Sequence, residues 1–216
     1  MSGIIINPYV YAAAGLADID NVYSMEFDGV DDSVNIGLLS ALNGSQYFSI
    51  SMWVNPSALT AATDFIFFSI YTSATERIFL EFFANNLIVN ISNGSSRQMS
   101  FPMTFSTGQW YNIVTVYDGT QVGADKLKCY VDAVAQTNTQ VSFPASLPTF
   151  TSDYRIGSYD PSVGYYRFAG NIDEAAIWNS DQSAEISDIF GATSTGKTAD
   201  LSELATPPTA WYRMGD

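Results

Sequence analysis

One stretch decides the fold class: Phe48-Ser49-Ile50-Ser51-Met52-Trp53-Val54-Asn55-Pro56. Every second side chain in it is large and apolar, which is the spacing at which side chains share one face of an extended chain. The dipeptide Asn55-Pro56 then ends the strand, because proline cannot donate to a β-ladder. This period of two predicts a strand with one face against a hydrophobic core.

The same alternation recurs outward from this stretch, in residues 77–83, 87–91, 110–117 and 127–131. Turn-forming Gly, Asn, Asp and Ser cluster between these runs. Many short strands separated by turns predict an all-β, two-sheet antiparallel jelly-roll sandwich. We expect one short helix near the C-terminus, over Ser183–Phe190 with Ser183 as its N-cap. A last strand is expected over Ala210–Met214.

Composition and charge narrow the classes of function. Apolar residues make up 47% of the 216 residues and aromatic residues 14%, so the chain has enough material for a core and is not a disordered protein. The 22 acidic residues outnumber the 8 basic ones, giving a net charge of −14. This charge would repel a phosphate backbone or an anionic bilayer. We therefore expect no nucleic-acid partner, and no segment has the length for membrane insertion.

Several phrases, taken together, resemble a known family. The first is Phe27-Asp28-Gly29-Val30-Asp31-Asp32-Ser33-Val34, and others follow in order at residues 48–56, 108–114, 128–132, 154–157 and 168–179. They resemble the motifs of laminin-G-like jelly rolls in the concanavalin A-like lectin/glucanase superfamily. The resemblance covers roughly residues 22 to 214. It implies two curved antiparallel sheets packed face to face, with both termini near one edge.

The segment before the first family motif is a separate feature. We expect residues 1–20 to form an apolar N-terminal arm and residues 21–216 to form the laminin-G-like domain. The arm is too apolar to stay free in water, so it adds a strand either to its own sheet or to a neighbouring molecule. The second alternative is favoured, because the family domain is complete without the arm. The assembly residues would be Ile4, Ile5, Ile6, Tyr9 and Tyr11.

The resemblance extends to structural proteins of tailed bacteriophages, which share the bare start and the closing Trp211–Asp216. It implies a non-enzymatic virion protein, either a capsid decoration or a tail or fibre component. We expect no secretion signal, and a location on the virion surface that becomes extracellular after lysis. Its partners would be other virion proteins, or copies of itself held through the arm. Host surface glycans are a further expected partner.

A turn-rich loop offers a candidate carbohydrate site. Sugar-binding sites stack aromatic rings on sugar faces and add polar hydrogen-bonding groups. The loop at 157–167 carries such groups at Tyr159, Asp160, Tyr165 and Tyr166. The alternative is that these tyrosines pack the loop onto the sandwich or bury against another subunit. Both interpretations remain open.

Clustered carboxylates offer a candidate calcium site. Asp28, Asp31 and Asp32 crowd one turn, and the resemblance places Asp173 near the same edge. Calcium prefers six to eight oxygen ligands, often carried on turns. The alternative is structural, since an Asp in such a turn bonds its own backbone. If calcium binds, the second functional hypothesis is a stand-alone calcium-dependent carbohydrate-binding module.

Catalysis is the least favoured hypothesis. The chain has no histidine, which excludes Ser-His and Cys-His machinery. A glucanase needs two carboxylates on the same side of the sugar-binding strand, but Asp173 and Glu174 are adjacent and should point to opposite sides. Glu81 has no acidic partner two or four residues away. Cys129, the one cysteine, lies in an alternating stretch and is expected to be a buried structural thiol.

Overall fold

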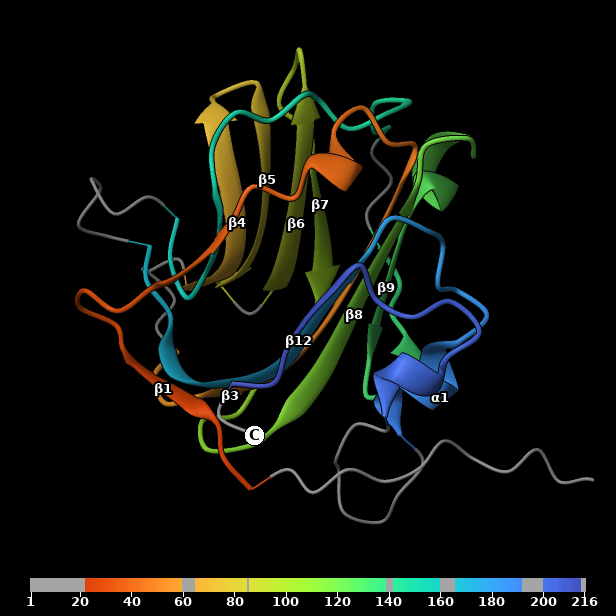
Figure 1. Ribbon diagram of the computed structural model, residues 1–216. Helices are drawn as coiled ribbons and strands as arrows, with labels where there is room; N and C mark the ends of the chain where they lie inside the picture. The colour runs from red at the N-terminus through yellow and green to blue at the C-terminus, as the bar shows by residue number, and fades with distance from the viewer. Residues whose placement is uncertain are drawn as a thin grey trace, which may run out of the picture.

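The computed structural model describes residues 22–59, 65–84, 86–138, 142–159, 166–191 and 200–214. Two antiparallel sheets face each other and curve together, as the jelly-roll prediction required (Figure 1). The sandwich is confirmed. The proposed N-terminal arm and its five assembly residues lie outside the described residues.

The first layer is a seven-stranded sheet that follows the order β1-β12-β3-β8-β9-β10, with β13 beside β12. Its strands are β1 (Met25–Asp28), β3 (Tyr47–Pro56), β8 (Tyr111–Asp118), β9 (Leu127–Val131), β10 (Val134–Ala135), β12 (Ala169–Trp178) and β13 (Ala210–Tyr212). The central strands β12, β3 and β8 are the longest of this layer and form its rigid middle.

The second layer is a six-stranded sheet in the order β2-β11-β4-β5-β6-β7. Its strands are β2 (Val34–Gly37), β4 (Phe65–Ser73), β5 (Glu76–Phe83), β6 (Asn86–Asn93), β7 (Gln98–Pro102) and β11 (Tyr154–Ile156). Strands β4 to β7 follow one another as antiparallel neighbours, so their side chains line up in rows across the sheet.

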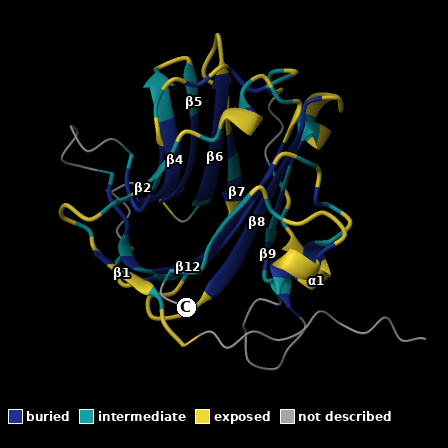
Figure 2. Ribbon diagram, viewed as in Figure 1, coloured by how far each residue is buried: buried dark blue, intermediate teal, exposed yellow. Residues whose placement is uncertain are grey.

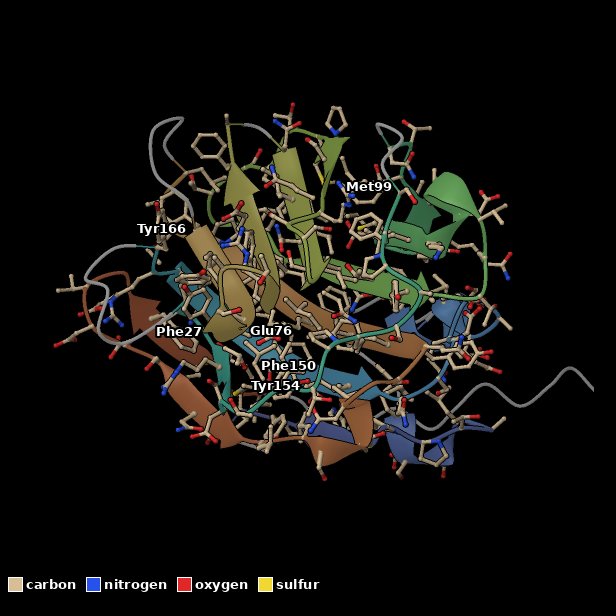
Figure 3. The ribbon with its side chains drawn as sticks, turned by 90° about the horizontal axis from the view of Figure 1, so that it is seen from above. Phe27, Glu76, Met99, Phe150, Tyr154 and Tyr166 are labelled. Atoms are coloured by element: carbon tan, nitrogen blue, oxygen red, sulfur yellow. The ribbon has the colours of Figure 1, made fainter. Side chains whose placement is uncertain are left out.

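The core fills the space between the two sheets. Alternate residues of each strand point inward, and buried residues therefore run along the central strands of both layers (Figure 2). Phe48 of β3 stacks on Phe68 of β4 with ring centroids 6.1 Å apart, so the contact joins the two layers. Figure 3 shows Phe150 and Tyr154 in the same interior.

The first and last described strands share one edge. Strand β1 pairs with the first half of β12, where Met25 faces Ile172. Strand β13 pairs with the second half of the same side of β12, where Tyr212 faces Ala175. For these two strands, the expectation that the ends of the domain meet at one edge is confirmed.

Two sequence-based boundaries were wrong. Helix α1 spans Ile186–Phe190, so it begins three residues later than the predicted helix. Ser183 is not its N-cap, because the Ser183 amide donates to Asp181 Oδ1 at 2.7 Å in a local turn. The last strand stops at Tyr212, two residues before the predicted end. Three short 3₁₀ helices complete the fold, at Ser40–Leu42, Gly123–Lys126 and Leu201–Glu203.

No helix in the described ranges is both long enough and apolar enough to cross a bilayer.

Cys129 is buried in the core at 1% exposure, as predicted. Burial raises the pKa of its thiol to about 12, because the thiolate would lose its hydration. We expect the native protein to resist a thiol reagent at pH 8 and to react with one equivalent after unfolding. Since the unfolded thiol ionises near pH 9, the folded state should lose stability as the pH rises from about 9 to about 12. Fast stoichiometric labelling of the folded protein would contradict this burial.

Candidate functional site

The outer face of the six-stranded sheet carries an unusual set of side chains on β5. Alternation sends Ile78 and Leu80 into the core and sends Arg77, Phe79 and Glu81 to the outside. Outward residues of a sandwich are normally solvated. Phe79 and Glu81 are nevertheless only 7% and 6% exposed. Something therefore covers the outside of this sheet.

The cover comes from described residues that follow β11 and precede β12, namely Ser158, Tyr159 and Tyr166. Ser69 of β4 donates its hydroxyl to the carbonyl oxygens of Ser158, at 2.7 Å, and Tyr159, at 3.0 Å. These bonds hold Ser158 and Tyr159 against the outer face. Tyr159 then packs on Phe79 with ring centroids 5.8 Å apart, edge to face. Tyr166 lies 6.0 Å from Tyr159 and completes the apolar contact with the sheet (Figure 3).

Beside this cover the outer face is hollowed into a groove, which we call the β5 groove. It has a volume of about 220 Å³ and is lined by Ile66, Arg77, Phe79, Glu81, Gln98, Tyr159 and Tyr166. The lining combines aromatic rings with a guanidinium, a carboxylate and an amide. This mixture of an apolar floor with a few polar groups is typical of small-ligand sites.

Arg77 lies in this wall beside neutral partners. Its Nη1 donates to the Tyr159 hydroxyl at 3.2 Å and its Nη2 donates to Ser96 Oγ at 3.1 Å. Its Cζ lies 5.1 Å from the centre of the Phe79 ring, a cation–π contact. Its Nε is shielded from water and has no hydrogen-bond partner. Within the described residues no carboxylate forms an ion pair with this guanidinium.

Three of the four carboxylates proposed for calcium do lie together. One ligand atom from each of Asp28, Asp31 and Asp32 falls within 4.8 Å of the others. Asp28 Oδ1 accepts from the Val30 amide at 2.7 Å, and this bond is the main cause of a lowered pKa of Asp28. Asp32 Oδ2 accepts from the Asp28 amide at 2.9 Å. The turn thus uses two carboxylate oxygens for its own backbone, as an Asp-rich turn does without a metal.

Asp173 is not part of this group. Its Cα is paired with Trp53 across the sheet, whereas Asp28 faces Ala169, four residues earlier on β12. The resemblance-based expectation that Asp173 joins the cluster therefore does not hold in the structure. Asp28, Asp31 and Asp32 fit calcium only as a partial ligand set, since the ion prefers six to eight oxygens.

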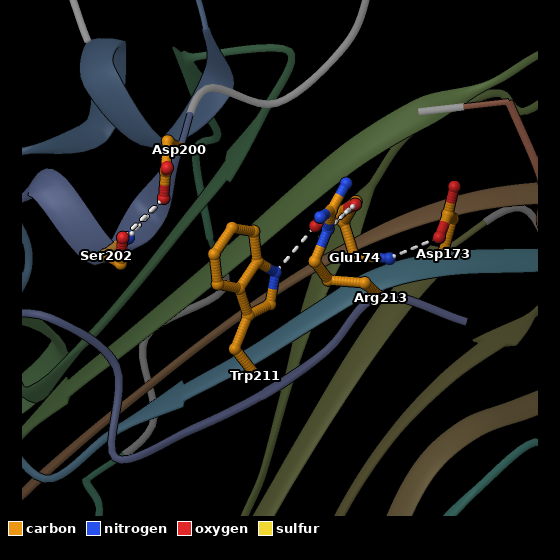
Figure 4. A network of polar contacts seen from close by, with 6 residues as sticks. All are labelled: Asp173, Glu174, Asp200, Ser202, Trp211 and Arg213. Carbon is orange, nitrogen blue, oxygen red and sulfur yellow. Dashed lines mark hydrogen bonds and ion pairs between the residues drawn. The ribbon is translucent and has the colours of Figure 1, made fainter. Parts of the chain in front are cut away.

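Asp173 and Glu174, the adjacent pair considered for catalysis, are both buried. A β-bulge between Asp173 and Ala176 gives Glu174 a φ of +49°, and both carboxylates lie on the same side of β12 (Figure 4). The expectation that they point to opposite sides is therefore wrong. Glu174 is fully buried and accepts from Trp211 Nε1 at 2.6 Å and from Arg213 Nε at 3.3 Å. Asp173 is only 5% exposed, so neither group can easily reach a substrate.

This arrangement of sheets and motifs corresponds to one protein family. Residues 28–186 match the sequence profile of Laminin_G_3, described as the Concanavalin A-like lectin/glucanases superfamily. The chain belongs to this family. No curated protein matches the chain in sequence.

Solved structures share the laminin-G-like fold at low identity. A heptameric SAP-like pentraxin from Limulus polyphemus has a TM-score of 0.56 and 11% identity, over 92% of this chain and 89% of that one. Domain 4 of the arabinanase AbnA from Geobacillus stearothermophilus, in complex with arabinotriose, has a TM-score of 0.59 and 22% identity, over 80% and 79%. The CBM40 of a Ruminococcus gnavus IT-sialidase, bound to α2,3-sialyllactose, has a TM-score of 0.59 and 8% identity, over 73% and 90%. These likenesses show the fold.

Of the sugar-binding residues proposed from the sequence, Tyr159 and Tyr166 line the β5 groove. Asp160 and Tyr165 lie outside the described residues. Both tyrosines also pack on the outer face of the sheet, as the structural alternative expects, and their part in sugar binding stays a prediction. Sequence reasoning missed Arg77, Phe79 and Gln98 of the groove. The alternation of residues 77–83 placed Arg77 and Phe79 on one outward face with Glu81, but nothing in the sequence marked that face as covered.

Proposed function

We propose that this laminin-G-like domain is a non-enzymatic glycan-binding module and that the β5 groove is its binding site. The observation that carries the proposal is the groove itself, on a face where alternation would otherwise leave solvated side chains. The likeness in fold to a domain in complex with arabinotriose and to a CBM40 bound to sialyllactose supports it.

The chemistry of the lining suits a sugar. The apolar face of a pyranose packs on aromatic rings, and Tyr159 and Tyr166 supply such rings in the groove lining. Glu81 and Gln98 can accept hydrogen bonds from sugar hydroxyls, and the Gln98 amide can donate. The volume of about 220 Å³ lies below the roughly 300–1,000 Å³ of pockets for drug-sized ligands. We therefore expect one sugar unit to bind, with the rest of the glycan outside.

The absence of catalysis is part of the same proposal. The sequence contains no histidine, and Glu174 is held by Trp211 and Arg213 away from solvent. Glu81 is the one carboxylate among the described residues of the groove lining, whereas a retaining glycosidase requires two at about 5–5.5 Å. Release of reducing sugar from any bound polysaccharide by the pure protein would overturn this part.

Gln98→Ala tests the groove. The purified protein is first screened on a glycan array, and the best glycan is then titrated by calorimetry. Gln98 is exposed at the groove, so its loss should weaken binding about fivefold, the value of roughly one net hydrogen bond. Gln46→Ala removes another exposed glutamine amide, outside the groove lining, and should leave affinity unchanged. Equal effects of the two variants, or no bound glycan, would contradict the proposal.

The location and the cofactor are finer parts of the proposal. We place the domain on the surface of a tailed-phage virion, supported by the sequence resemblance, and its detection in purified particles by mass spectrometry is the test.

Calcium would bind at Asp28, Asp31 and Asp32, where it would neutralise three neighbouring carboxylates. The Arg167 guanidinium donates to the Asp32 carbonyl at 3.5 Å and opposes a cation there. If a chelator changes neither the melting temperature nor glycan affinity, calcium has no role.

A further inference from the structure

We propose that the β5 groove takes a sugar bearing an anionic oxygen group, a carboxylate or a sulfate ester, and that Arg77 binds this group. The inference deepens the proposed glycan-binding function and rests on it. It is carried by the surroundings of Arg77 in the groove wall and by the order of side chains along β5.

Among the described residues, no carboxylate forms an ion pair with the guanidinium of Arg77. Arginine stays protonated in proteins, and this chain has 22 acidic residues to pair with only 8 basic ones. Arg77 nevertheless contacts two hydroxyls and one aromatic ring, and no carboxylate of the described residues pairs with it. A partly buried cation that pairs with no carboxylate has lost part of its hydration, and no Coulombic attraction compensates for that loss. An anionic group of a ligand would therefore be stabilised strongly beside Arg77 in the β5 groove.

The donors needed for such an anion are present. A guanidinium has five N–H donors, and the described contacts of Arg77 use one hydrogen on each Nη. One further hydrogen on each Nη and the Nε hydrogen remain, and the planar, fork-like spacing of guanidinium donors matches the two oxygens of a carboxylate or a sulfate. The Tyr159 hydroxyl and Ser96 Oγ fix the plane of the fork before a ligand arrives, which lowers the entropy lost on binding.

The order of side chains along β5 sets the direction of the ligand. Arg77, Phe79 and Glu81 follow one another on the outward face, so the Cα atoms of Arg77 and Glu81 are about 13 Å apart along the strand, and the guanidinium lies at the Phe79 ring. A sugar in the groove with its anionic group toward Arg77 offers hydroxyl donors to Glu81. The reverse direction would place two negative groups together, which is unfavourable. One orientation is therefore selected.

Matched sugars test the inference by calorimetry. Lactose, 3′-sialyllactose and 3′-sulfolactose share a core and differ in their charged group, and trigalacturonate is compared with its methyl ester. We expect a charged member of either set to bind and its neutral partner to bind much more weakly. Comparison of the carboxylated sugars with the sulfated sugar shows which of the two anionic groups the site binds. Arg77→Met should weaken binding of the charged sugar about 30-fold, and Arg77→Lys about tenfold because the ammonium lacks the fork.

Lys128→Met is the control, since it removes the same charge from the other sheet and should change affinity less than about twofold. Melting temperatures verify that each variant is folded. If Arg77→Met is not folded, the affinity of Arg77→Lys is compared with that of the unmodified protein instead. Equal binding of charged and neutral partners, or no effect of either Arg77 variant, overturns the inference. If only neutral glycans from the array bind the groove, the inference fails while the proposed function stands. If no glycan binds at all, both fail.

Discussion

Replacing Gly157 by alanine is expected to destabilise the protein by about 4 kcal/mol, which would lower its melting temperature by about 12 °C. A Cβ on Gly157 would lie 2.2 Å from Cε1 of Phe27, a ring in the core. The backbone there also has a φ of +83°, a conformation that side chains disfavour by roughly 1–2 kcal/mol. Strain and overpacking add in the same direction. Chemical denaturation monitored by tryptophan fluorescence gives the free energy of unfolding.

Gly37→Ala separates the two causes. Gly37 has a φ of +76°, and a Cβ there would meet no atom within 4 Å. Its replacement should therefore show the strain alone, about 1 kcal/mol. A double variant with Phe27→Ala should cost less than the sum of the two single variants, because the small side chain removes the clash. A Gly157→Ala variant as stable as Gly37→Ala would show that the Phe27 ring does not lie against Gly157.

Replacing Arg213, the ion-pair partner of Glu174, is the second change expected to lower the free energy of unfolding strongly. Arg213→Met should cost about 3 kcal/mol, because it leaves a fully buried carboxylate without its cation. The value lies at the lower end of the range for such changes, since the Arg213 side chain is 29% exposed and water can enter the space it leaves. The Trp211 indole would remain as a donor to Glu174. The measurement is again the free energy of unfolding at neutral pH.

Two further variants test whether the loss of stability comes from the Arg213–Glu174 ion pair. Arg97→Met removes an exposed arginine and should change stability by less than about 0.5 kcal/mol. Adding Glu174→Gln to Arg213→Met removes the buried charge and should restore a large part of the loss. If Arg213→Met costs no more than Arg97→Met, water screens the pair and the pair does not stabilise the fold.

The fold was predictable because its signal is local. The alternation in residues 48–54 depends only on neighbouring side chains, and the structure has the corresponding strand at Tyr47–Pro56. The predicted strand at 87–91 likewise lies within β6. The start of helix α1 was misplaced because Ser183, a good N-cap by type, is engaged instead by Asp181.

The groove was only partly predictable because it is assembled from distant segments. Ile66, Arg77, Gln98 and Tyr159 come from three strands and a connecting loop, and only the register of the sheet brings them together. The loop tyrosines could be chosen from the sequence by residue type. Arg77 could not be chosen in this way. Its role depends on which face of β5 is covered, and on the fact that no described carboxylate pairs with it. A single sequence records neither property.

The meeting of β1 and β13 at one edge has a consequence for how this domain can be joined to other proteins. Met25 and Tyr212 face residues of β12 that are three positions apart, a separation of about 10 Å. A unit whose entry and exit points are so close can be spliced into a surface loop of a host chain without opening that host. The β5 groove belongs to the opposite layer, so such a graft would keep the groove apart from the edge that joins the host.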